Sequence, residues 1–130
     1  MAFFDKFFSS DKNKAQNKLV WNNIQSTEDL EAAMAKSYEQ PIALFKHSTR
    51  CSISSMAKDR LERSWDFAEG SGPLMYYLDL ISYRQVSNEI AERLNVHHES
   101  PQLILVKNGG AVYDASHNDI TVTELKEALV

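Results

Sequence analysis

Short apolar runs alternate with segments of helical character along most of this chain, and this alternation limits the folds open to it. Five runs have the length and residue types of β-strands, at residues 19–24, 41–45, 74–79, 102–107 and 111–114. Four segments carry helical periodicity or helix-capping signals, at residues 26–38, 51–68, 82–94 and 121–129. Strands that alternate with helices indicate parallel strands joined by crossover helices.

The last two predicted strands form a β-hairpin. Asn108-Gly109-Gly110 separates them, and asparagine followed by glycine is a pair that tight hairpin turns prefer. The earlier strands are each followed by a helix, whereas these two are joined directly. The order β-α-β-α-β-α-β-β-α therefore predicts an α/β fold, with a mixed central sheet of about five strands flanked by helices on both faces.

Length and composition favour one domain preceded by a short N-terminal segment. With 130 residues, of which 43% are hydrophobic, the chain can bury a core without disulfides. We predict a domain over residues 19–130 and an arm or short helix over residues 1–18. That segment fits either a docking or membrane-touching element or an arm that packs back on the domain or frays, and we expect the second. Its aromatic residues are Phe3, Phe4, Phe7 and Phe8.

Charge and hydropathy argue against several classes of function. A net charge of −4 and a pI near 5.5 do not suit nucleic-acid binding. No apolar run approaches the roughly 20 residues of a membrane span. The N-terminal segment is not expected to be a signal peptide, because the charged residues Asp5 and Lys6 interrupt its apolar residues. A single cysteine rules out an internal disulfide and fits a reducing compartment. We therefore expect a cytoplasmic protein with no nucleic-acid partner and no stable membrane association.

Cys51, the single cysteine, falls between a predicted strand and a predicted helix. Open α/β sheets place their ligands at the carboxyl ends of strands, and the N–H groups and dipole of a helix start stabilise an anion. A thiol in that place is generally more acidic than a free cysteine. Arg50, Lys46 and a protonated His47 would add positive potential. A small buried hydrophobic residue is the alternative, but the polar residues before Cys51 favour a reactive thiol.

Ser100-Pro101 stands directly before the first strand of the hairpin. Proline is common at the first position of a strand, and most bonds to proline are trans. Together with a reactive cysteine on the second helix, however, the pair resembles thioredoxin-like proteins, in which a cis-proline lies beside the reactive sulfur. The resemblance implies a thioredoxin-like fold, a cis Ser100-Pro101 bond close to Cys51, and an extended substrate strand bonded to the backbone of Ser100.

Longer stretches make the resemblance specific. The stretch FKHSTRCSIS, a helix ending in ERLNV, and the later SPQLILVKNGGAVYDASH resemble the YtxJ family, the monothiol bacilliredoxins of the bacillithiol system. The likeness runs from about Trp21 to the C-terminus. Family members commonly carry Thr-Cys-Pro-Ile where this chain has residues 50–53, with Arg50 and Ser52 in place of threonine and proline. The charge beside the sulfur and the start of its helix therefore differ.

The resemblance implies a monothiol thiol–disulfide oxidoreductase. Cys51 would remove bacillithiol, or a similar low-molecular-weight thiol, from mixed disulfides on S-thiolated client proteins. A second small thiol would resolve the adduct, because the chain has no second cysteine. The small thiol is then a co-substrate, and no tightly bound cofactor is expected.

Two polar residues near Cys51 have open roles. Ser54 stands where a resolving cysteine would lie in a C-x-x-C motif. Its hydroxyl either donates to the thiolate or is an ordinary polar group of the first helical turn. His47 either acts as a base toward Cys51 or has a packing or hydrogen-bonding role.

Two rival functions remain open from the sequence. A monothiol glutaredoxin-like iron–sulfur carrier would hold a cluster between two chains, although that class usually has glycine where this chain has Ser52. A non-catalytic thioredoxin-like adaptor would bind peptides in the same groove. His97-His98-Glu99 is a weak metal signal because no cysteine pair lies near it, so we expect a solvated loop there and no metal site.

Overall fold

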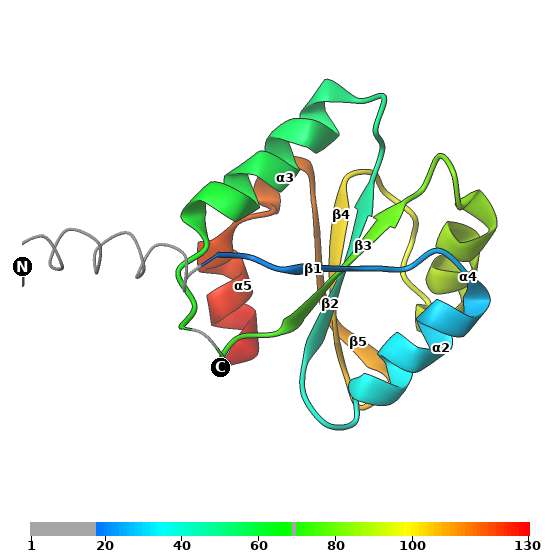
Figure 1. The fold of residues 1–130 in the computed structure, drawn as a ribbon, viewed down its shortest axis with the longest axis horizontal. Coiled ribbons are helices and arrows are strands. Elements are labelled where there is room, and N and C mark those ends of the chain that lie inside the picture. The colour runs from blue at the N-terminus through cyan, green and yellow to red at the C-terminus, as the bar shows by residue number, and fades with distance from the viewer. Residues whose placement is uncertain (1–17, 69) are drawn as a thin grey trace, which may run out of the picture.

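The computed structural model describes residues 18–68 and 70–130, and its elements follow the predicted order (Figure 1). Each predicted strand and helix is present, with some bounds that differ. The elements are β1 (Trp21–Asn23), α2 (Thr27–Lys36), β2 (Ile42–His47), α3 (Ser52–Ser64), β3 (Leu74–Asp79), α4 (Arg84–Leu94), β4 (Gln102–Lys107), β5 (Gly110–Ser116), the short 3-10 helix η1 (His117–Asp119) and α5 (Val122–Leu129).

β2 lies at the centre of the five-stranded sheet, whose order is β1-β3-β2-β4-β5. β1 and β2 run parallel to β3, whereas β4 is antiparallel to β2 and β5 is antiparallel to β4. All of β2 is buried, which fits its mostly apolar sequence and central position. Because β2 and β3 are parallel and in register, both deliver the chain to the same edge of the sheet, where α3 and α4 begin.

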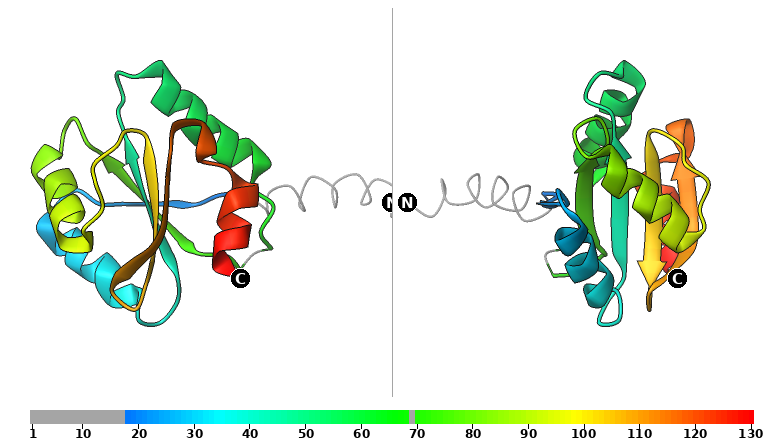
Figure 2. Two further views of the ribbon diagram at one scale, coloured as in Figure 1. Left: turned by 180° about the vertical axis from the view of Figure 1, so that it is seen from behind. Right: turned by 90° about the vertical axis from the view of Figure 1, so that its right-hand side faces the viewer.

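Helices cover both faces of this mixed sheet, as predicted. α3 and α5 lie on one face, and α2 and α4 lie on the other (Figures 1 and 2). The core under α3 and α5 includes Phe45 and Leu61, and the core under α2 and α4 includes Leu44, Leu30 and Ile90. Successive residues of β2 therefore point to opposite faces of the sheet.

The predicted caps and hairpin turn form as the local sequence indicates. The hydroxyls of Ser26 and Thr121 each accept a hydrogen bond from the backbone N–H three residues along, at 3.0 and 3.1 Å. Asn108 and Gly109 have φ angles of 51° and 80°, which are the left-handed values that a two-residue hairpin turn requires. These features confirm the starts of α2 and α5 and the pairing of β4 with β5.

Several bounds differ from the prediction. β1 spans only Trp21–Asn23, and β5 extends to Ser116. α4 begins at Arg84 rather than at residue 82, because Asp79 holds the preceding turn. The Asp79 carboxylate accepts from the Ser82 hydroxyl at 2.9 Å and from two backbone N–H groups of the turn.

α3 ends at Ser64, earlier than the predicted residue 68. Trp65 follows the helix with an extended backbone, at φ −63° and ψ 118°. Its ring centroid lies 4.7 Å from that of Phe67, and both rings pack against the core under α3 and α5. The apolar periodicity after Ser64 is therefore a wrong helix signal, because these aromatic side chains reach the core from an irregular segment.

The phenylalanine-rich start, predicted to be an arm or short helix, lies outside the described residues. The domain boundary at residue 19 stays a prediction for the same reason. Among residues 18–68 and 70–130, no helix combines the length and apolar character that a membrane crossing requires.

Candidate active site around Cys51

Cys51 occupies the N-cap position of α3, just beyond the end of β2. Its N–H donates to the carbonyl of Ser48 at 3.2 Å, and its own carbonyl accepts from the N–H of Ser55 at 3.1 Å. These two bonds fix the backbone of Cys51, while its side chain remains partly exposed. The thiol is thus held in a defined place and is accessible to another molecule.

The first turn of α3 has no side-chain acceptor for its backbone N–H groups. No side chain caps this helix start, and its first turn contains no acidic residue. The first backbone N–H groups of a helix have no partner within the helix, and a side chain at the N-cap is their usual acceptor. A thiolate at this position would accept from these groups and face the positive end of the helix dipole.

Ser54 is fully buried and bonds to the end of β2. Its Oγ accepts from the N–H of Ser48 at 3.0 Å and lies 2.7 Å from Nδ1 of His47. These bonds tie the first turn of α3 to the strand and close the loop that carries Cys51. The two roles predicted for Ser54 from the sequence included neither bond. The Oγ of Ser54 supplies the acceptor that the buried N–H of Ser48 needs.

His47 is buried on the face of the sheet that α3 covers. Its ring stacks on Phe45 with centroids 5.9 Å apart, and the ring of Tyr77 lies 5.5 Å away. Burial lowers the pKa of His47, and the nearby ammonium of Lys58 lowers it further. The imidazole is therefore neutral at pH 7 and adds no positive charge beside Cys51 there. The contacts of His47 with Phe45, Tyr77 and Ser54 fit the second of its two predicted roles, packing and hydrogen bonding.

Lys46 points to the opposite face of the sheet. It is fully buried, and it alternates along β2 with Ile42 and Leu44, which belong to the core under α2 and α4. Its Nζ lies 3.2 Å from Nδ1 of His98, in the loop between α4 and β4. Its amine faces the other layer of helices, so the predicted positive potential of Lys46 at Cys51 would have to act across the sheet and stays a prediction.

The buried amine of Lys46 is expected to cost stability at neutral pH. Burial lowers the pKa of Lys46 from its ordinary 10.5 to about 8, so the folded state disfavours the ammonium. Lys46→Met should raise the free energy of unfolding at pH 7 by about 1–4 kcal/mol, the range for replacing buried ionic groups by apolar ones. The difference should shrink between pH 8 and 10.5, where the wild-type lysine becomes neutral in the folded state. Urea unfolding at several pH values measures this, and a destabilised variant at pH 7 would contradict it.

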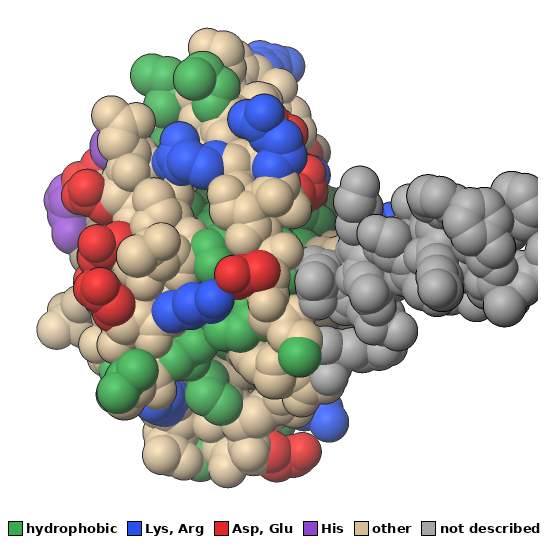
Figure 3. All heavy atoms as spheres, turned by 90° about the vertical axis from the view of Figure 1, so that its left-hand side faces the viewer, with side chains coloured by type: hydrophobic (Ala, Val, Ile, Leu, Met, Phe, Trp, Pro, Cys, Tyr) green, Lys and Arg blue, Asp and Glu red, His purple; other side chains and the backbone are tan. Residues whose placement is uncertain are grey.

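The surface beside Cys51 is apolar with a basic neighbour. Arg50 is exposed, and the side chains of Ile53 and Met56 are 52% and 63% exposed. Hydrophobic side chains gather on this face at the end where α3 begins, with basic side chains near them (Figure 3). The helical spacing of Ile53 and Met56 does not place them in the core, because the buried residues of α3 are Ser54, Ala57 and Leu61.

The Ser100–Pro101 peptide bond is cis, which confirms the prediction. Pro101 is buried before β4, and its carbonyl accepts from the N–H of His117 at 3.2 Å. The Oγ of Ser100 is buried and has no hydrogen-bond partner among the residues that the structure describes. The contact of the proline ring with the sulfur of Cys51 stays a prediction.

His97-His98-Glu99 leads into this cis bond. Both histidines are exposed, as expected of a solvated loop, but His98 also contacts the buried Lys46. Across the described parts of the chain, no three His, Cys, Asp or Glu side chains are grouped to hold a metal ion. The link from this loop to Lys46 and Gln102 was not predicted. Its signal in the sequence was a polar residue at one end of each of two largely apolar runs, Lys46 after residues 41–45 and Gln102 at the start of residues 102–107.

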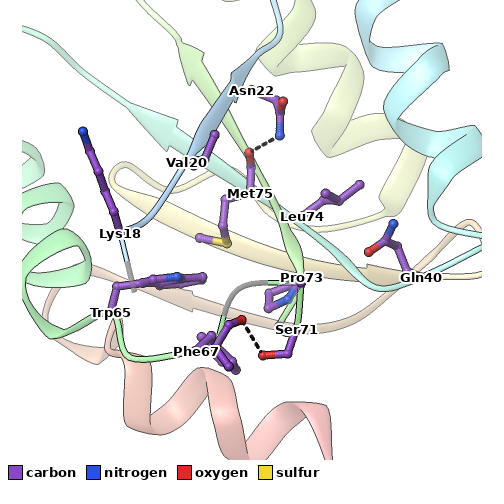
Figure 4. Close-up of a pocket in the computed structure, with 13 residues that line it drawn as sticks. Lys18, Val20, Asn22, Gln40, Trp65, Phe67, Ser71, Pro73, Leu74 and Met75 are labelled. Atoms are coloured by element: carbon purple, nitrogen blue, oxygen red, sulfur yellow. Dashed lines mark hydrogen bonds between the residues drawn. The ribbon is translucent and has the colours of Figure 1, made fainter. Parts of the chain in front are cut away.

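A pocket of about 390 Å³ lies away from Cys51, at the other end of the sheet where β3 begins. Lys18, Trp65, Phe67, Pro73 and Met75 are among the residues that line it (Figure 4). None of the predicted site residues belongs to its lining. The pocket is therefore separate from the thiol site at Cys51.

Comparisons with known proteins identify the family and the fold of this chain. The family described as monothiol bacilliredoxin BrxC matches residues 22–125. One similar solved structure, described as having a thioredoxin fold, is 32% identical, covers 84% of this chain and 93% of its own, and has a TM-score of 0.71. A thioredoxin from Malassezia sympodialis is 18% identical over 86% of this chain and 89% of its own, with a TM-score of 0.67. A thioredoxin from Trypanosoma brucei brucei is 15% identical over 88% and 89%, with a TM-score of 0.63. The chain has the thioredoxin fold.

Proposed function

Because the chain belongs to the monothiol bacilliredoxin BrxC family, we propose that it removes bacillithiol, or a similar low-molecular-weight thiol, from mixed disulfides on client proteins. Cys51 is the proposed nucleophile. The observation that carries this proposal is a partly exposed thiol at the N-cap of α3, where neither a capping side chain nor an acidic residue competes with a thiolate.

In the first proposed step, the Cys51 thiolate attacks the small-thiol sulfur of a client mixed disulfide. A new disulfide bond forms between Cys51 and the small thiol as the bond to the client breaks. The client sulfur leaves with the electron pair and takes up a proton, so the client is reduced. Cys51 now carries the oxidation as a mixed disulfide.

In the second step, another small-thiol molecule resolves this adduct. Its thiolate attacks the small-thiol sulfur bound to Cys51, which releases a small-thiol disulfide and regenerates the Cys51 thiolate. The chain cannot do this alone, because Ser54 stands where a resolving cysteine would lie and there is no other cysteine. The proposed co-substrate is therefore a free low-molecular-weight thiol, and no tightly bound cofactor is required.

The surroundings of Cys51 suit a protein client. The exposed side chains of Ile53 and Met56 offer apolar contact, and Arg50 offers a positive charge. We also propose that Ser100 and Pro101 take part in client binding, with backbone hydrogen bonds to an extended client segment, as the thioredoxin fold implies. We propose S-thiolated proteins as partners and the cytoplasm as the compartment, since a lone reactive thiol suits a reducing environment.

Intact-mass analysis tests the monothiol cycle. After exposure to bacillithiol disulfide, the protein should gain the mass of one bacillithiol less two hydrogens per chain, because Cys51 is its single thiol. Excess bacillithiol should then remove the adduct completely. Ser52→Ala, an exposed first-turn change beside the sulfur, serves as a matched control and should gain the same mass. A wild-type protein that takes no adduct would contradict the proposal.

A further inference from the structure

Lys46 is a buried cation whose side-chain partner is a histidine. It is fully buried in the central strand, and within the described parts of the chain no carboxylate lies within ion-pair distance of its Nζ. Its hydrogen-bond partner is Nδ1 of His98 at 3.2 Å. A buried charge without an opposite charge is costly to a fold, so this contact calls for a reason other than stability.

His98 belongs to the loop that ends in the cis Ser100–Pro101 bond. Gln102, the first residue of β4, holds the same loop from the other side. Its Nε2 donates to the carbonyl of His97 at 2.9 Å, and its Oε1 accepts from the N–H of Glu99 at 3.4 Å. Gln102 is only 1% exposed.

Lys46 and Gln102 are neighbours across the sheet. They face each other in the antiparallel register of β2 and β4. Two adjacent buried polar side chains therefore bond three consecutive loop residues, 97–99, immediately before Ser100. The position of the cis-proline segment relative to the strand end thus depends on these bonds.

We propose that Lys46 and His98 form a latch that positions the Ser100–Pro101 segment for client binding, and that this latch opens when His98 takes up a proton. The existence of the latch is inferred from the Lys46–His98 contact. Its effect on client binding rests on the proposed function. Lys46 is a positioning residue in it, because its amine acts through His98.

The charge balance around His98 explains the pH dependence. Nδ1 accepts from the Lys46 ammonium only while it is unprotonated. Burial lowers the pKa of His98, and the positive charges of Lys46 from β2 and Arg84 from α4 lower it further. Glu99 in the same loop acts in the opposite direction, and His97 lowers the pKa slightly more. The latch is therefore closed at pH 7 and opens below the ordinary histidine value of 6.5.

Hydrogen exchange and client kinetics together test the latch. Lys46→Met removes the amine, and His98→Asn keeps an acceptor near Nδ1 that does not titrate. At pH 7.5, Lys46→Met should speed backbone exchange in residues 97–101 roughly fivefold and raise KM for a bacillithiolated client by a similar factor, as expected for loss of one hydrogen bond. Iodoacetamide alkylation of Cys51 should be unchanged, because the sulfur and its helix are untouched.

The pH profile separates the latch from a structural role. Wild-type KM should rise as the pH falls from 7 to values below 6.5, whereas His98→Asn should keep a flat KM over the same range. His97→Asn is the matched control, because His97 contributes its backbone carbonyl to Gln102, and it should behave as wild type.

Unchanged exchange in Lys46→Met would overturn the inference, as would a His98→Asn profile that matches wild type. Faster exchange with no client turnover by any form, wild type included, would support the latch and overturn the proposed function instead.

Discussion

Cys51→Ser is expected to lower the rate of client reduction at least roughly 10³-fold, because a serine hydroxyl is not ionised at neutral pH and is a far weaker nucleophile. The chain holds no other thiol that could replace it. The rate is measured as release of bacillithiol from a bacillithiolated client, with free bacillithiol as the resolving thiol. The free energy of unfolding should not fall, because the swap is nearly isosteric at a partly exposed site and serine is a preferred N-cap residue.

Ser52→Ala provides the control for that experiment, since it changes an exposed residue next to Cys51 and should retain activity. A Cys51→Ser protein that reduces clients at the wild-type rate would show that the proposed function is wrong. A brown protein that carries iron and sulfide would indicate the iron–sulfur carrier. A wild-type protein that binds client peptides and never takes an adduct would indicate the adaptor.

Ser54→Cys is expected to convert the monothiol cycle into a dithiol one. The new thiol would lie one helical turn from Cys51, where it can attack the mixed disulfide, expel the small thiol and close an internal disulfide. Mass analysis should show loss of the bacillithiol adduct without added thiol, and a protein lighter than the reduced form by two hydrogens. An adduct that persists in Ser54→Cys would contradict the expected geometry.

The contacts of Ser54 add a stability cost to this design. Its hydroxyl accepts from the Ser48 N–H and bonds His47, and a sulfur atom is a much weaker acceptor. Leaving a buried N–H without a good partner costs about 1–3 kcal/mol, which urea unfolding should detect. Ser54→Ala is the matched control. It should lose the same bonds and stability while it keeps the adduct, because it adds no thiol.

Local patterns in the sequence determined much of this protein. The hairpin followed from Asn108-Gly109, and the starts of two helices followed from Ser26 and Thr121. The place of Cys51 between β2 and α3 was predicted too. These features depend on backbone preferences and on side chains within a few residues of each other, so neighbouring residues carry the information. The cis bond at Pro101 was predicted only from the resemblance to thioredoxin-like proteins, because most bonds to proline are trans.

The helix periodicity was less reliable where aromatic residues follow α3. Trp65 and Phe67 reach the core from an irregular segment, and Ile53 and Met56 lie at the surface beside Cys51. A spacing of three or four residues says that side chains share a face, but not whether that face meets the core. Tertiary packing determines which face of α3 is buried, and that face includes Ser54.

Only the tertiary structure decided the partners of the polar residues near Cys51. Lys46 and His47 are adjacent in sequence, yet alternation along β2 sends them to opposite faces of the sheet. One meets His98, which is distant in sequence, and the other meets Ser54. Strand register and loop closure bring these pairs together, and burial then shifts their protonation. The Lys46–His98 contact joins residues 52 positions apart, and the His47–Ser54 contact depends on how the loop between β2 and α3 closes, so no local pattern records either of them.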